Sequence, residues 1–261
     1  MNSVSFAMRD SLTMLGRTLR HILRNPAALL GSVVTPIFIL LMMVYVFGGA
    51  MRVGSTGQTE AIYINYMLPG MLFITIIQAT GIVAVRINTD MRQGIIARFR
   101  TMSVARTAVL NGHVGGGVLG ILLSLGVVIG LGVLLGFRPV ADLGAWLAAL
   151  GVLTLFAVAV SWLAVGLGLT IKSPDGVSSA LLPLYLLPYF SSAFVPTDTM
   201  PAAMAWFAHY QPFTPIIDTV RGLLLGIPTS NSATIAVAWC VGITLVGYLG
   251  ARAMYERDHT P

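Results

Sequence analysis

Six long apolar runs constrain the fold of this chain more than any other feature. An α-helix needs about 20 apolar residues to cross the hydrocarbon core of a bilayer. Hydrophobic residues make up 56% of the 261 residues and charged residues only 9%, whereas a soluble domain carries about 25% charged residues. We therefore expect an all-α integral membrane protein with six transmembrane helices. The runs lie at 27–47, 61–85, 108–137, 143–171, 176–195 and 232–251.

The most charged interior segment, residues 86–106, separates the second run from the third. It carries five of the fifteen basic residues of the chain, so it cannot lie in hydrocarbon. Met91, Ile95, Phe99 and Met102 recur at spacings of four, four and three, which places them on one face of a helix. This pattern predicts a short amphipathic helix at about 90–104. It either lies on the lipid headgroups or presents its apolar face to a soluble partner.

A second amphipathic helix is expected at the N-terminus, within residues 1–26. Apolar residues repeat there at alternating spacings of four and three, and Arg17, Arg20 and Arg24 lie on another face. A basic amphipathic helix before the first span is typical of a helix lying in the membrane interface. It serves either as an anchor alone or also as a contact for a cytoplasmic partner.

The positive charges predict the orientation of the chain. With both ends in the cytoplasm, twelve of the fifteen Lys and Arg residues lie inside, and only Arg52, Arg138 and Arg221 lie outside. Such an excess in short loops marks the cytoplasmic side of a membrane protein. Residues 197–230 then lie outside, where four prolines interrupt an otherwise apolar stretch. We expect two short helices there, which either dip into the outer leaflet or pack on the bundle.

Small and polar residues inside the apolar runs suggest how the helices pack. Tyr63 and Tyr66 are expected to be interface anchors near the outer end of the second span. His113 is best explained as a residue that hydrogen-bonds between helices. The third run contains glycines four residues apart, which let another helix approach closely; packing within the chain is favoured over a dimer seam. These glycines are Gly112, Gly116, Gly120, Gly126 and Gly130.

Motifs for nucleotide binding and catalysis are absent from the sequence. The only lysine, Lys172, follows Leu169-Thr170-Ile171 rather than a glycine-rich loop, so the chain has no P-loop. No metalloprotease, Cys-x-x-Cys or serine-hydrolase motif occurs. We therefore expect no catalytic residues, no metal site and no cofactor on this chain, and the positive charge does not indicate nucleic-acid binding. The apolar spans contain no Asp or Glu, which argues against an ion-driven carrier.

Three motifs resemble those of a known family. They are YINYMLPG at 63–70, DMRQGIIARFRTMSVAR at 90–106, and SSAFVPTDTMP followed by YQPFTPIIDTVRGLLLG within 191–226. With them the chain resembles the membrane subunit of ABC-2 type exporters, in particular the bacterial daunorubicin-resistance permeases. Two positions depart from the family pattern: Ser103 stands where proline is common, and Gln211 replaces the usual asparagine before Pro212.

The resemblance implies a half-transporter in the cell membrane. Two permease subunits, identical or paralogous, would pair and bind two separate ATP-binding subunits that hold ATP and Mg. The N-terminal helix would be the family's interface helix, residues 27–254 the transmembrane domain, residues 197–230 an external re-entrant hairpin, and residues 255–261 a cytoplasmic tail. The coupling interface with the ATPase would include Asp90, Gly94, Ile95, Arg98, Phe99, Met102 and Arg106. Structural positions of the family motifs would be Pro69, Gly70, Pro212, Pro215, Asp218 and Arg221.

Together these features predict a permease subunit that exports an amphipathic drug or a lipid-like cargo with ATP hydrolysed by a partner. The near absence of charge inside the spans favours such a cargo over a charged peptide. One alternative is a stand-alone six-helix carrier or channel, which would transport without ATP. A second alternative is an intramembrane enzyme or a scaffold, for which we find no cluster of catalytic side chains.

Overall fold

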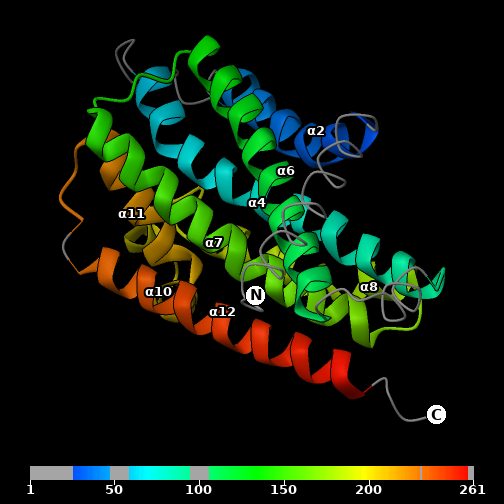
Figure 1. Ribbon diagram of the computed structural model, residues 1–261. Coiled ribbons are helices and arrows are strands. Elements are labelled where there is room, and N and C mark those ends of the chain that lie inside the picture. Colours follow the sequence, from blue (N-terminus) through cyan, green and yellow to red (C-terminus); the bar gives the residue numbers. More distant parts are fainter. Residues whose placement is uncertain (1–25, 48–58, 95–105, 230, 258–261) are drawn as a thin grey trace.

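The computed structural model describes residues 26–47, 59–94, 106–229 and 231–257, and every regular element within these ranges is a helix (Figure 1). The long helices are α2 (Pro26–Met42), which continues as η1 (Met43–Phe47), α4 (Thr59–Arg92), α6 (Arg106–Leu134), α7 (Leu143–Thr170) and α12 (Ser232–Arg257). Four of them, α4, α6, α7 and α12, are long and apolar enough to cross a membrane. The apolar part of the first helix, Leu30–Val46, is shorter. The all-helical membrane fold is confirmed, whereas six spans stay a prediction.

Helix α4 is the centre of the bundle. It packs against α2 and α6 on one side and against α7 on the other (Figure 1). In its apolar window 83% of the residues are buried, compared with 17% for α12. Thr75, Thr80 and Thr89 interrupt this apolar helix, and each hydroxyl donates to the carbonyl four residues earlier, at 2.8, 2.7 and 2.9 Å. The threonines therefore satisfy their hydrogen-bonding groups within α4 itself.

Two glycines of α6 outside the predicted stripe, Gly117 and Gly132, allow close packing on α4. A Cβ atom on Gly117 would lie 2.6 Å from Cγ2 of Val83, and one on Gly132 would lie 2.7 Å from Cδ1 of Leu68. A Cβ atom on Gly126 or Gly130 would meet nothing within 4 Å. The predicted pair Gly126–Gly130 therefore seats no other helix of this chain, whereas the role of Gly112, Gly116 and Gly120 stays a prediction.

The fifth apolar run does not form one helix. It contains α8 (Pro174–Ala180), α9 (Leu182–Leu186) and the 3-10 turn η3 (Leu187–Phe190), and the chain is non-helical from 191 to 193. Pro183 and Pro188 each stand in the first turn of a new short helix, because proline lacks a backbone N–H and disfavours a helical residue before it. The expectation of a continuous helix at 176–195 was wrong. We call residues 174–193 the broken segment.

Two helices follow between the broken segment and α12. After the short turn η4 (Thr197–Thr199) come α10 (Ala202–Tyr210) and α11 (Phe213–Leu225). Ten of the thirteen residues of α11 are buried, and the helix packs on α12, α7 and α4. It ends at Gly226 in the left-handed conformation, with φ of 67°. Helix α11 is therefore part of the core of the bundle, whereas α10 exposes Trp206 and Tyr210.

Three predicted features lie outside the described residues. They are the N-terminal helix with Arg17, Arg20 and Arg24, the part of the coupling helix beyond Gly94, and the end of the tail. All three stay predictions. Residues 90–92, which we expected to begin the coupling helix, are instead the end of α4, and Gly94 adopts a φ of 68°. This conformation is costly for any residue other than glycine, and it turns the chain away from the helix axis.

Candidate functional site

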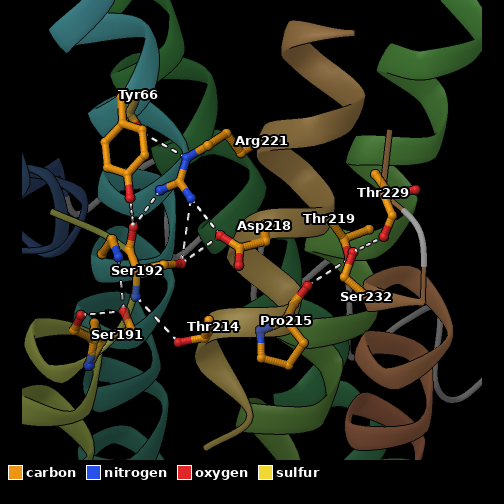
Figure 2. Close-up of polar contacts among 12 residues, drawn as sticks. Tyr66, Ser191, Ser192, Thr214, Pro215, Asp218, Thr219, Arg221, Thr229 and Ser232 are labelled. Atoms are coloured by element: carbon orange, nitrogen blue, oxygen red, sulfur yellow. Dashed lines mark hydrogen bonds and ion pairs between the residues drawn. The ribbon is translucent and has the colours of Figure 1, made fainter. Parts of the chain in front are cut away.

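A buried arginine joins α11, α4 and the broken segment. Arg221 lies on the inner face of α11, and only 7% of the residue is exposed. Its Nε donates to the carbonyl oxygen of Tyr66 at 3.1 Å, and its Nη2 donates to the carbonyl oxygen of Ser192 at 2.6 Å. Its Nη1 forms an ion pair with Oδ1 of Asp218, also at 2.6 Å. Figure 2 shows the guanidinium directed into the space between these three residues. We call Tyr66, Ser192, Asp218 and Arg221 the arginine cluster.

Tyr66 contacts the arginine through its ring as well as its backbone. The centroid of the ring lies 3.9 Å from Cζ of Arg221, in a cation–π contact. The phenol oxygen donates to the carbonyl oxygen of Ser192 at 3.0 Å. Tyr66 is half-buried and belongs to a polar cluster that the sequence did not predict, whereas its expected role as an interface anchor stays a prediction.

The helix break after η3 leaves backbone N–H and C=O groups without partners in a helix, and residues of the cluster bond to them. Ser191 is extended, with φ of −118° and ψ of −177°, so the groups that follow cannot bond along a helix. Side chains satisfy them: the N–H of Ser192 donates to Oγ1 of Thr214, and the N–H of Ala193 donates to Oγ of Ser191 (Figure 2). The hydroxyl of Ser192 donates to Oδ1 of Asp218 at 2.7 Å. A non-helical turn is therefore kept inside the bundle without unpaired N–H groups at these two positions.

Gly70 brings α4 against this turn. A Cβ atom on Gly70 would lie 2.6 Å from the carbonyl oxygen of Ala193 and 2.7 Å from its Cα. Since both neighbouring atoms belong to the backbone, a side chain at this position would force α4 and the broken segment apart. Pro69 precedes this glycine inside α4, which stays helical on both sides of it.

Arg221 and Asp218 carry opposite charges, so the arginine cluster contains the counter-ion of its own cation. Burial lowers the pKa of the Arg221 guanidinium, whereas Tyr66 and Asp218 raise it. Arginine stays protonated in proteins, so the cluster holds a permanent cation. The side chain of Asp218 is 41% exposed, so its carboxylate links the buried cation to the surface of the molecule.

Further hydrogen bonds hold the start and the middle of α11. Gln211 donates to the carbonyl oxygen of Phe190 at 2.5 Å just before the helix, and Pro212 is the residue that caps it. The hydroxyl of Thr219 donates to the carbonyl oxygen of Pro215 at 2.6 Å and lies 3.3 Å from Oγ of Ser232, the first residue of α12 (Figure 2). The motif around residues 211–221 therefore fixes α11 to η3 and α12 as well as to α4.

The structure brings together some of the residues predicted from the sequence. Gly70, Asp218 and Arg221 take part in the contact between α4, α11 and the broken segment, with Pro69 beside Gly70, and Pro212 and Pro215 lie in the first turn of α11. Ser192 and the backbone of Tyr66 are members that the sequence reasoning missed. Both residues lie in motifs used for the family resemblance, YINY and SSAF. The motifs therefore pointed to these positions but did not show that they contact Arg221.

The coupling residues are described only at their two ends. Asp90 lies 3.5 Å from Nε2 of His113 on α6, which agrees with a histidine that bonds between helices. Ile95, Arg98, Phe99 and Met102 lie outside the described residues, and Arg106 is placed only as the first residue of α6. Asn88, which the sequence reasoning also missed, donates from α4 to two carbonyl groups at the end of α7.

Comparison with known proteins finds relatives that match this chain along almost its whole length. The sequence model of the ABC-2 type transporter family matches residues 10–225. The daunorubicin resistance ABC transporter permease protein DrrB1 of Streptomyces coeruleorubidus is 31% identical over 252 residues, which cover 95% of this chain and 86% of that protein. The probable doxorubicin resistance ABC transporter permease protein DrrC of Mycobacterium tuberculosis is 23% identical over 259 residues, which cover 99% of this chain and 92% of that protein.

Proposed function

Because the chain belongs to the ABC-2 type transporter family, we propose that it is the membrane subunit of an ATP-driven exporter that moves an amphipathic drug or lipid-like molecule out of the cell. The observation that carries this proposal is the 31% identity to a drug-resistance permease over 95% of the chain. The matched region includes the arginine cluster and the coupling segment, residues 90–104.

We propose that the energy comes from a separate chain. This sequence has no P-loop, and the relatives are named as permeases. Two ATP-binding subunits would hold ATP and Mg, and two permease subunits, identical or paralogous, would form the pathway. In this arrangement both termini and the coupling segment face the cytoplasm, as the distribution of Lys and Arg predicts.

The coupling segment would dock on the ATPase through Gly94, Ile95, Arg98, Phe99 and Met102, with Phe99 as the apolar anchor. Support comes from its position in the chain. Its first residues, 90–92, are the last of α4, and the left-handed Gly94 follows them. A displacement of the segment by ATP-driven closure therefore acts first on α4, which packs on α2, α6, α7, α8, α9 and α11. Nucleotide shifts the equilibrium because the ATPase would contact the segment differently when open and closed.

The cargo class follows from the chemistry of the spans. The four apolar helices contain acidic residues only at their ends, so a pathway along them offers little charge to a strongly polar molecule. The two named relatives are associated with daunorubicin and doxorubicin resistance, which supports an amphipathic drug. The external hairpin, residues 197–230, would lie near the exit.

Transport in proteoliposomes tests the proposal. The neighbouring reading frames are searched for an ATP-binding subunit with a P-loop, the chain is purified together with it, and ATP-dependent movement of daunorubicin is measured by fluorescence. We expect transport only with ATP and the partner, and Phe99→Asp is expected to weaken partner binding by about 2 kcal/mol or more, roughly 30-fold. Phe99→Leu, which keeps the apolar contact, is the matched control. Equal transport without ATP or partner would instead identify a stand-alone carrier or channel.

A further inference from the structure

Helix α4 contacts the broken segment, or the turn that leads into it, at three levels along its length. The outer contact is Gly70 with Ala193, together with the hydrogen bond from Tyr66 to Ser192. The middle contact lies between Gly81 and the side chain of Tyr185, and the inner contact is made by Asn88. Helices α8 and α9 pack along α4 between these points.

The inner contact is a helix cap supplied by a different helix. The last carbonyl groups of an α-helix lack partners within the helix. Nδ2 of Asn88 donates to the carbonyl oxygens of Gly168, at 3.0 Å, and Ile171, at 2.5 Å. A Cβ atom on Gly168 would lie 2.5 Å from the carbonyl oxygen of Ala84, so the backbones of α4 and α7 touch at this point. Ile171 is followed at once by the residues that start α8.

The amide of Asn88 is used only for its donors. The residue is 2% exposed, and its Oδ1 is buried without a hydrogen-bond partner. A buried unpaired acceptor is unfavourable, so an apolar side chain of similar size would avoid that cost. The two N–H groups of the amide are therefore the physical reason for asparagine at this position.

The middle contact leaves no room for a side chain. A Cβ atom on Gly81 would lie 1.8 Å from the hydroxyl oxygen of Tyr185 and 3.1 Å from its Cζ. The hydroxyl end of Tyr185, on α9, therefore lies against the backbone of α4. Any larger residue at Gly81 requires Tyr185 to leave this position.

We infer that Asn88 is a positioning residue of the transport cycle, which clamps the α7–α8 turn to α4 so that α4 and the broken segment move as one body. Displacement of the coupling segment after Gly94 then reaches Ser192 and the arginine cluster without a hinge at Pro183 or Pro188. The prolines shape the broken segment to follow α4 rather than letting it flex. This inference rests on the proposed function, because it assigns the route of a movement that the ATPase drives.

The test measures the distance between spin labels on the two parts. Gln93 at the end of α4 and Ser179 on α8 are both exposed, and each is replaced by a labelled cysteine in a Cys240→Ala background. The complex with its ATP-binding subunit is compared without nucleotide and with ATP plus vanadate. We expect an unchanged distance distribution in the otherwise native protein. In Asn88→Leu the distribution shifts or broadens on trapping, and transport falls by roughly tenfold, while the complex still assembles and retains basal ATPase activity.

Asn111→Leu is the matched control, because Asn111 is an exposed asparagine in the first part of α6. This substitution should leave the spin-label distance and the transport rate unchanged. A distance that changes on trapping in the native background would overturn the inference, as would normal transport by Asn88→Leu. Absence of ATP-dependent transport by the native complex would instead contradict the proposed function, and the inference with it.

A second pair of variants keeps the inference testable if Asn88→Leu does not fold. Gly81→Ala should reduce transport by roughly tenfold, because its Cβ displaces Tyr185. Adding Tyr185→Phe removes the oxygen at 1.8 Å and should restore most of the transport. Normal transport by Gly81→Ala, or no recovery in the double variant, would show that this contact does not couple the two parts.

Discussion

Replacing Arg221 by methionine tests whether the arginine cluster stabilises the fold. The substitution keeps most of the apolar length of the side chain and removes its donors to Tyr66, Ser192 and Asp218. Removing one partner of a buried ion pair costs about 3–5 kcal/mol. Two features reduce this value: the Asp218 side chain is 41% exposed, so water solvates it, and the Ser192 carbonyl keeps the Tyr66 hydroxyl as donor. We therefore expect a loss of about 2–4 kcal/mol.

The chain contains its own reporter for this measurement. Cys240 is its only cysteine and is fully buried on α12, so a thiol-reactive fluorogenic dye labels it only when the bundle opens. At roughly 2–4 °C per kcal/mol for a chain of this size, Arg221→Met should melt about 4–16 °C below the native protein in the same detergent. Lys172→Met is the matched control, since Lys172 is exposed.

A double variant separates loss of the ion pair from loss of packing. With Asp218→Asn added, the carboxylate that Arg221→Met leaves without a partner is gone, so the two changes together should cost less than their sum by about 0.5–3 kcal/mol. Additive effects would refute the direct pairing of Asp218 with Arg221. A melting temperature of Arg221→Met within about 1 °C of that of the native protein would refute the stabilising role of the cluster.

Other substitutions give results that the contacts of α4 predict. Gly132→Ala should destabilise the protein by about 1–3 kcal/mol, because its Cβ would lie 2.7 Å from the side chain of Leu68. Gly130→Ala should instead be neutral or stabilising by up to about 1 kcal/mol. Melting of the two variants, followed with the Cys240 dye, checks this difference. Tyr66→Phe removes one hydrogen bond to Ser192 and should cost about 1 kcal/mol while keeping the ring against the arginine, and a melting temperature as low as that of Arg221→Met would contradict this assignment.

The sequence predicted the parts of the fold that follow a local pattern. The runs at 61–85, 108–137, 143–171 and 232–251 correspond to α4, α6, α7 and α12, because twenty or so consecutive apolar residues are sufficient evidence for a helix of this kind. The run at 176–195 has the same composition and was assigned in the same way. It contains Pro183 and Pro188, however, and the structure breaks the segment into separate short helices at both of them.

The site was less predictable because its contacts join distant parts of the chain. Charge counting placed Arg221 on the external side but gave no contact for it, and the structure shows it buried against the carbonyl oxygen of a residue 155 positions earlier. Asn88 pairs with a carbonyl 80 positions later and belongs to no recognised pattern. Family resemblance pointed to Gly70 and Arg221 separately. Only the three-dimensional arrangement shows that both act on the turn at Ser192 and Ala193.

The self-paired threonines of α4 have a consequence for the biosynthesis of the protein. Helix α4 precedes α7, α11 and α12 in the chain, so it enters the bilayer before the helices that will surround it have been made. A hydroxyl facing hydrocarbon without a partner is costly, but Thr75 and Thr80 carry their acceptors one turn away on the same helix. Asn88 and Tyr66, by contrast, must wait for partners from later segments. We expect the newborn α4 to tolerate lipid along its middle, while its two ends complete their contacts last.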